Sequence, residues 1–116
     1  MTNEDGQGWG GKVEMYVILW EFEVRPDKID AFLAAYRSNG AWTKLFARAD
    51  GYLGSELLSS LDTDRGPRFV TTDRWRAEDD FVRFQQEFGS EYRTLDTELE
   101  GLTFSERKLG AFTTEG

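Results

Sequence analysis

The sequence predicts one α+β domain in which helices cover one face of a four-stranded antiparallel sheet. Four segments alternate apolar and polar residues with a period of two, which is typical of strands. Two longer segments repeat apolar residues every three or four positions, which is typical of helices. These segments follow one another in the order β-α-β-β-α-β. The chain of 116 residues suits one domain, and we divide it into a flexible leader over residues 1–12 and a single domain over residues 13–113.

The first half of the chain predicts one strand and a helical region. Residues 14–24 read EMYVILWEFEV, in which every even position from Tyr16 onward is apolar, and this alternation favours a strand. Pro26 and the acidic residues that follow it favour the start of a helix. Apolar residues then recur with helical spacing up to residue 49, but a Ser-Asn-Gly sequence that ends at Gly40 interrupts them. We expect either one helix with a bend near Gly40 or two short helices.

The second half predicts a hairpin, a long helix and a last strand. Residues 52–61 and 68–76 alternate as strands do, and the DTDRGP sequence between them is rich in turn residues. The helix is expected to begin at Glu78-Asp79-Asp80, because carboxylates favour the positive end of a helix dipole. Gly89 weakens the middle of this helix, and residues 103–112 read as the final strand. The apolar stripe of the helix consists of Phe81, Phe84, Phe88, Tyr92, Leu95, Leu99 and Leu102.

This order of elements is that of a ferredoxin-like sandwich, in which two β-α-β halves place both helical layers on one face of the sheet. The helices leave the other face uncovered, although Met15, Val17 and Leu19 on the first strand and Val70 on the third are apolar there. An exposed apolar sheet face usually marks an interface. We therefore expect a homodimer in which two copies pair sheet against sheet with two-fold symmetry.

The charge balance excludes several classes of partner. The chain has 14 Lys and Arg against 22 Asp and Glu, which gives a formal net charge of −8. Nucleic acids and anionic membranes are bound through basic surfaces. No stretch approaches the ~20 apolar residues of a membrane span, and the first residues do not have the pattern of a signal peptide. We expect a cytoplasmic protein that binds neither nucleic acid nor membrane.

The absent residue types exclude much of common catalytic chemistry. Without Cys, the chain has no disulfide framework, no thiolate nucleophile and no ligands for an iron–sulfur cluster. Without His, it has no His-based triad, no His proton shuttle and no proximal ligand of the usual kind for haem. Aromatic residues make up 15% of the chain, which is too much apolar surface for a disordered protein.

Two sequence runs carry a resemblance to a known family. They are G-x-x-G-x-E-L from Gly51 to Leu57 and R-W-x-x-E-x-x-F from Arg74 to Phe81. Their order and spacing, within about residues 14–112, resemble the antibiotic biosynthesis monooxygenase (ABM) family. This resemblance implies a dimeric α+β barrel of ferredoxin-like protomers. It also implies, for some members, oxygenation of polycyclic phenols or quinols without metal or flavin.

The haem-degrading members of that family do not match this sequence. They carry an Asn on the first strand, and a Trp and a His on the second long helix. The corresponding positions here hold Trp20, Phe84 and a residue near Asp96. Because none of the three agrees, we exclude haem degradation.

Oxygenation without a cofactor needs a dry apolar cavity, a group that removes a proton and groups that stabilise the resulting anion. We expect this cavity between the sheet and the helices. The candidate catalytic residues are Trp20, Tyr92 and Asp96, the last as a general base. The candidate substrate-binding residues are Phe22, Trp42, Phe84 and Phe88.

These residues also have plainer interpretations. A stripe of Phe at helical spacing is typical of a core, and a Trp such as Trp75 buries a large area wherever it packs. Tyr92 can pack in the core with its hydroxyl at the rim, and Asp96 on a charged helix can simply be solvated. Arg74 fits a surface ion pair better than it fits stabilisation of an anion.

The sequence favours a monooxygenase that needs no cofactor and acts on an apolar, aromatic or quinol-like small molecule with O₂. Two alternatives stay open. One is a binding module of the same fold that holds such a molecule without turning it over. The other is a dimeric regulatory protein whose chemistry has lapsed.

Overall fold

The structure is a computed structural model that describes residues 14–115. The predicted leader, residues 1–12, lies outside the described residues. The strands and helices predicted from the sequence are present, with small shifts at their ends. In chain order they are β1 (Tyr16–Val24), η1 (Pro26–Lys28), α2 (Ile29–Tyr36), α3 (Ala41–Phe46), β2 (Tyr52–Ser59), β3 (Arg68–Trp75), α4 (Glu78–Leu99), η2 (Glu100–Leu102) and β4 (Thr103–Thr113).

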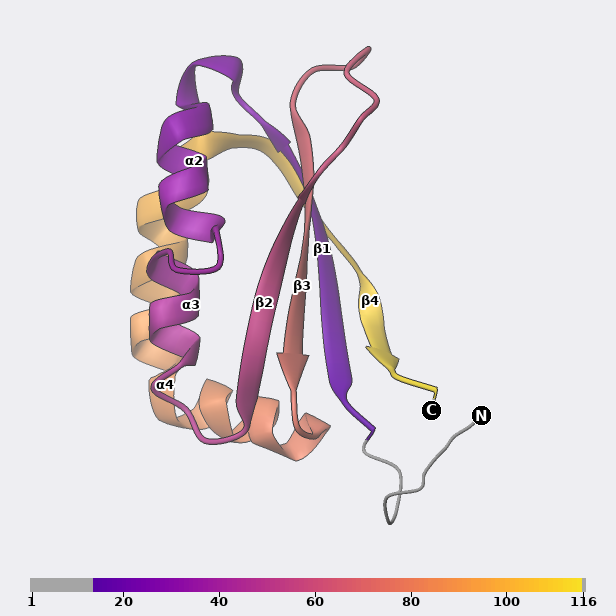
Figure 1. Cartoon of the computed structure of the whole chain (residues 1–116). Coiled ribbons are helices and arrows are strands. Elements are labelled where there is room, and N and C mark those ends of the chain that lie inside the picture. Colours follow the sequence, from indigo (N-terminus) through magenta and orange to yellow (C-terminus); the bar gives the residue numbers. More distant parts are fainter. Residues whose placement is uncertain (1–13, 116) are drawn as a thin grey trace.

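The four strands form one antiparallel sheet in the order β2-β3-β1-β4. β1 pairs with both β3 and β4, so it lies in the interior of the sheet although it comes first in the chain. Figure 1 shows α2, α3 and α4 together on one side of the sheet and no helix on the other. This confirms the predicted ferredoxin-like arrangement.

The first helical region divides into two short helices at Gly40. A Cβ atom at Gly40 would lie 2.6 Å from the carbonyl oxygen of Ala34, so a larger residue would require the backbone to shift. The Gly40 N–H donates to the Arg37 carbonyl oxygen at 2.8 Å. In turn, the Thr43 hydroxyl donates to the Gly40 carbonyl oxygen at 3.0 Å. These contacts fix where α3 begins and therefore where Trp42 lies.

A kink divides α4. Phe88 has non-helical backbone angles, with φ −119° and ψ 20°, one residue before the Gly89 that was expected to weaken the helix. In Figure 1 the first part of α4 runs below the sheet, and the second part turns upward beside α3. As a result, the ring of Tyr92 on the second part lies 5.0 Å from the ring of Trp42 on α3.

The core is a cluster of aromatic rings between the sheet and the helices. Trp75 at the end of β3 is fully buried, and so is Phe84 on α4. The Trp75 ring lies 5.3 Å from that of Phe84 and 5.7 Å from that of Phe46. Aromatic contacts of this kind add to the stabilisation from burial alone, so Trp75 ties β3 to both α3 and α4.

The opposite face of the sheet combines ion pairs with apolar side chains. Arg68 lies 3.5 Å from Glu21 and 3.0 Å from Glu23, and Arg107 lies 2.8 Å from Glu21. Strand alternation and register place apolar residues on the same face. They are Val17, Leu19, Leu58, Val70 and Phe112, of which Leu58 and Phe112 are about half exposed.

Replacement of Trp75 by Ala should lower the free energy of unfolding by about 3–5 kcal/mol, because it leaves a large cavity in the aromatic core. Trp75→Phe is the matched control. Among the described residues the Trp75 indole N–H has no hydrogen-bond partner, so Phe loses only part of the ring volume and should cost about 1–2 kcal/mol. Urea unfolding followed by circular dichroism measures both. Equal losses in the two variants would contradict the central role of ring packing.

Candidate active site

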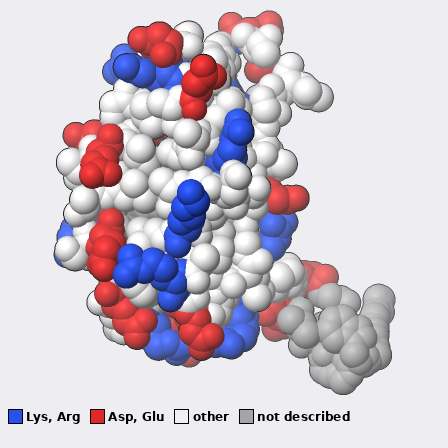
Figure 2. Space-filling view, turned by 60° about the vertical axis from the view of Figure 1, so that its left-hand side comes forward, with Lys and Arg blue, Asp and Glu red and all other residues white. Residues whose placement is uncertain are grey.

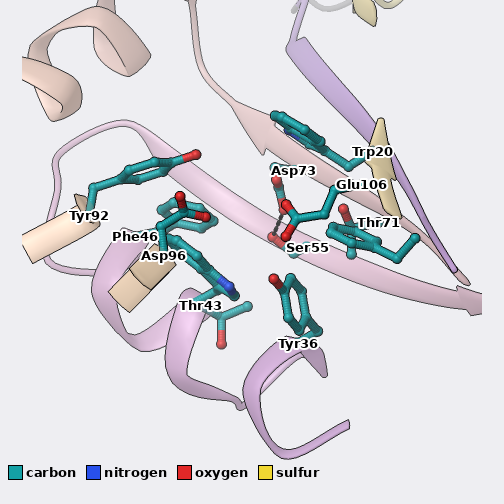
Figure 3. A pocket seen from close by; sticks show the side chains of 12 residues that line it. Trp20, Tyr36, Thr43, Phe46, Ser55, Thr71, Asp73, Tyr92, Asp96 and Glu106 are labelled. Carbon is teal, nitrogen blue, oxygen red and sulfur yellow. Dashed lines mark hydrogen bonds between the residues drawn. The ribbon is translucent and has the colours of Figure 1, made fainter. Parts of the chain in front are cut away.

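A cavity of about 150 Å³ lies between the helix-facing side of the sheet and the helices. A dry apolar cavity of that volume is large enough to hold one benzene ring. Its aromatic wall consists of Trp20, Phe22, Tyr36, Trp42, Phe46 and Tyr92. Its polar lining consists of Thr43, Ser55, Thr71, Asp73, Asp96 and Glu106. Figure 3 shows that these side chains converge on one space from the strands and from the helices.

The aromatic wall is continuous across four elements. Alternation along β1 places Trp20 and Phe22 on the helix-facing side, where their rings stack at 6.4 Å. Tyr36 ends α2, and its ring lies 6.1 Å from that of Trp42 on α3. Trp42 in turn contacts Tyr92 on α4. A flat aromatic ligand in the cavity would therefore meet ring faces and edges on several sides.

Asp73 lies at the inner end of the cavity on β3. Its partner in the sheet is Ser55 on β2, and the Ser55 hydroxyl donates to Asp73 Oδ1 at 2.7 Å, as the dashed line in Figure 3 marks. The Tyr52 hydroxyl lies 2.5 Å from Ser55 Oγ. Because Ser55 uses its only proton for Asp73, Tyr52 must be the donor to Ser55. The three side chains thus form a hydrogen-bonded chain that ends on a carboxylate.

Burial raises the pKa of Asp73 to about 6, and the hydrogen bond from Ser55 partly opposes this rise. A carboxylate with a pKa near 6 is ionised at neutral pH, yet it holds a proton more readily than an exposed Asp does. This is the range in which a side chain works well as a general base.

Three side chains of the wall provide hydrogen-bond donors: Tyr36, Tyr92 and Trp42. Burial is the main cause that raises the pKa of Tyr92 to about 12, with the neighbouring carboxylates adding to it. Burial also raises the pKa of Tyr36. Both hydroxyls therefore stay protonated at neutral pH. The indole of Trp42 lies near the Tyr36 hydroxyl but outside hydrogen-bond geometry, so its buried N–H has no partner among the described residues.

Two carboxylates lie at the mouth of the cavity. Asp96 comes from the second part of α4 and Glu106 from β4, and both residues are exposed. In Figure 3 both side chains point toward the space between the aromatic walls. Burial of its carboxyl group raises the pKa of Glu106, and the charge of Asp96 raises it further.

The structure brings together five of the seven residues that the sequence nominated. Those that line the cavity are Trp20, Phe22, Trp42, Tyr92 and Asp96. Phe84 and Phe88 are not among the residues lining this cavity. Phe84 is fully buried in the core. Phe88 packs at the edge of the core: its ring lies 5.6 Å from that of Phe84, and the guanidinium carbon of Arg48 lies 4.9 Å from its ring centre.

Apart from Asp96, sequence reasoning missed the polar half of the lining, above all Asp73 and Ser55. A signal for Asp73 was present, because it alternates in step with Phe69 and Trp75 on β3 and must share their buried face. A carboxylate at such a position rarely lacks a role. Glu106 gave no such signal, since it lies among other polar residues of β4.

The acidic run at the start of α4 plays a structural part. Asp80 is buried and forms ion pairs with Arg76, at 2.7 Å, and with Arg83. A Cβ atom at Gly51, where φ is +91°, would overlap the Asp80 side chain. These contacts join the two sequence runs that resembled the family, and they lie outside the cavity lining.

Charges of both signs are interspersed on the face shown in Figure 2, which lies over the helices. None of the helices in residues 14–115 combines the length and the apolar character needed to cross a membrane. Within the same residues, no three carboxylates lie close enough together to hold a metal ion.

The chain resembles solved structures over most of its length. SnoaB, a cofactor-independent oxygenase from Streptomyces nogalater, is 22% identical with a TM-score of 0.64, and the match covers 90% of this chain and 96% of SnoaB. A dimeric ferredoxin-like protein of unknown function from Thermobifida fusca is 13% identical with a TM-score of 0.58, over 96% of this chain and 99% of the other. At these identities the likeness shows the fold alone.

The sequence itself places the chain in a family. No curated protein matches it. The model of the family "Antibiotic biosynthesis monooxygenase" does match, over residues 15–92, a range that includes β1, β2, β3 and most of the cavity wall. The resemblance carried by the runs at Gly51–Leu57 and Arg74–Phe81 is thereby confirmed, and the chain belongs to the antibiotic biosynthesis monooxygenase family.

Proposed function

We propose that the chain is a monooxygenase that uses no cofactor and oxidises a phenolic or quinol-like aromatic molecule with O₂. One observation carries this proposal. The aromatic cavity has at its inner end a carboxylate, Asp73, with a pKa of about 6, and this combination can both hold an aromatic ring and take a proton from it. Membership of the ABM family and the likeness to SnoaB support the proposal.

The reaction balances without an external reductant. A phenol loses its proton to Asp73, and the phenolate transfers one electron to O₂. The resulting radical pair combines to form a carbon–oxygen bond. Loss of the ring proton at that carbon then cleaves the O–O bond. One oxygen atom leaves as water with that proton and the proton held by Asp73, and the other oxygen atom remains in a quinone. In total, one phenol and one O₂ give one quinone and one water.

We assign the proton acceptor to Asp73 instead of the predicted Asp96. Asp96 is exposed at the mouth, where bulk water surrounds its carboxylate. Asp73 is desolvated and held by Ser55, so it is a stronger base in a fixed position. The hydroxyl of Tyr92 and the free indole N–H of Trp42 are the donors available to a phenolate oxygen.

We also propose that two copies pair through the uncovered sheet face. Val17, Leu19 and Val70 give this face apolar surface, and Glu21 and Glu23 with their arginine partners lie toward one end of it. Such a face suits an isologous dimer.

Oxygen uptake in the presence of naphthols and anthrones tests the proposed reaction. The wild-type rate should rise as the pH increases through about 6, because Asp73 must be ionised to accept a proton. Asp73→Asn should lower the rate by about 10²–10⁴-fold. Asp64→Asn is the matched control, since Asp64 lies in the exposed loop between β2 and β3. Tight binding of these compounds without uptake by the wild type would show a binding module instead.

The same variant should gain stability. In the folded state the pKa of Asp73 is raised from 3.8 to about 6, so ionisation of Asp73 disfavours folding. This penalty grows as the pH rises from the unfolded pKa toward the folded pKa of about 6, and it levels off above it. Asp73→Asn removes the charge, and its stability advantage over the wild type should grow by about 1 kcal/mol between pH 5 and pH 7.5. Denaturant unfolding at both pH values measures this. An advantage independent of pH would contradict the assignment.

Sedimentation tests the proposed dimer. The wild type should have twice the 13.3 kDa mass of the chain at micromolar concentration. Val70→Glu should yield monomers, because it buries a charge beside Glu21, its partner in the sheet. Val82→Glu on α4 introduces the same charge at an exposed position of the helical layer and should leave the dimer intact. A wild-type monomer would refute the pairing.

A further inference from the structure

We propose that the molecule bound in this cavity is an arylalkylamine, whose aromatic ring enters the aromatic cavity while the protonated amino group on its alkyl chain lies between Asp96 and Glu106. This inference rests on the proposed function in so far as it places the substrate in the same cavity, and it specifies the chemical class of that substrate.

The first argument is the charge of the cavity. Its lining includes the three carboxylates Asp73, Asp96 and Glu106 and no Lys or Arg. Within residues 14–115, every arginine that forms an ion pair does so with an acid outside the cavity. These acids lie on the outer face of the sheet or are Asp50, Asp80 and Glu91. A ligand with a carboxylate or phosphate would meet only like charge in the cavity, whereas a cation would meet unpaired opposite charge.

The second argument is the position of Asp96 and Glu106. They reach the mouth from different elements, and the negative charge of Asp96 disfavours ionisation of Glu106. Two like charges held near each other cost free energy, and a cation between them removes that cost. Neither carboxylate forms an ion pair with a Lys or Arg of residues 14–115. Lys108, which shares the helix-facing side of β4 with Glu106, does not line the cavity.

The third argument is the aromatic surface beside these carboxylates. Tyr36, Trp42 and Tyr92 form a connected wall, with ring separations of 6.1 Å and 5.0 Å, and all three line the same cavity as Asp96 and Glu106. Aromatic rings together with carboxylates are the usual surroundings of a bound ammonium group. A metal ion fits less well, because no three acids among the described residues lie close enough to coordinate one.

The fourth argument is an independent sign that a ligand belongs here. Trp42 is 8% exposed, and its indole N–H is buried without a hydrogen-bond partner among the described residues. A buried donor of this kind is costly unless a ligand or water satisfies it. A phenolic oxygen in the cavity would supply the acceptor, while the amino group of the same molecule would occupy the mouth.

A protonated amine would also reduce the electrostatic repulsion that the proposed reaction creates in the cavity. Removal of a proton from a phenol leaves a phenolate in a cavity that already contains three carboxylates, which opposes the step. A positive charge on the same substrate offsets this repulsion. The substrate would therefore bring a cation that favours oxygenation and that the cavity lining does not provide.

Calorimetric titration with three single-ring phenols of matched size tests the inference. They are 4-(2-aminoethyl)phenol, 4-(2-hydroxyethyl)phenol and 3-(4-hydroxyphenyl)propanoate, which carry a positive, a neutral and a negative group. The wild type should bind the amine at least tenfold more tightly than the alcohol, and the propanoate most weakly. The ratio of amine to alcohol affinity should fall as salt is added, because screening weakens the attraction at the exposed mouth.

The variants show where the preference arises. The double variant Asp96→Asn with Glu106→Gln should bring the amine-to-alcohol ratio close to one. Glu98→Gln removes the same charge from α4 at a position that does not line the cavity, and it should keep the ratio of the wild type. A ratio near one in the wild type, or a preference that survives in the double variant, would overturn the inference.

These outcomes are separate from those of the proposed reaction. Equal binding of all three phenols would overturn the inferred preference for an amine and would still show that the cavity binds a ligand. Oxygen uptake with neutral naphthols would then still test the proposed reaction. Binding of none of the three would remove the cavity as a site for phenols, and both proposals would fall with it.

Discussion

Burial of the helix-facing side of β3 is the constraint on which the rest of the structure depends. Along this strand the alternation that turns Phe69 and Trp75 toward the helices also turns Thr71 and Asp73 toward them. Trp75 fills the core, where it joins α3 to α4. Asp73 instead borders the cavity, because no large side chain covers it. The same two-residue period therefore fills the core with Trp75 and places a desolvated carboxylate two residues earlier on the same strand.

Two breaks in the helices keep the space around Asp73 from being filled. Gly40 ends the first helical segment and lets α3 start in a new direction, which brings Trp42 to the wall. The kink at Phe88 turns the second part of α4 toward the sheet, which brings Tyr92 and Asp96 to the same place. Without these breaks, straight helices would carry these side chains past the cavity. The irregular parts of the helices thus shape the cavity, whereas the regular part of the sheet packs the core.

The charges of the cavity come at a cost to stability, and this is common at functional sites. A desolvated Asp73 opposes folding at neutral pH, and the pairing of like charges at Asp96 and Glu106 adds to the strain. Other acids among the described residues are paired: Asp80 and Glu21 each form ion pairs with two arginines. The contrast separates carboxylates that stabilise the fold from carboxylates that are available to a ligand.

The sequence by itself determined the order of the elements, the antiparallel sheet, the side of β1 that is buried and the family, because each depends on local periodicity or on short runs of residues. It also nominated Trp20, Phe22, Trp42, Tyr92 and Asp96, which the structure brings to one cavity. Only the tertiary structure decided that Phe84 is in the core, that Phe88 does not line the cavity, and that Ser55 donates a hydrogen bond to Asp73. The physical reason is that these outcomes depend on strand register and on the angle of a kink. Both bring together side chains that are far apart in the chain, and neither produces a periodic pattern in the sequence.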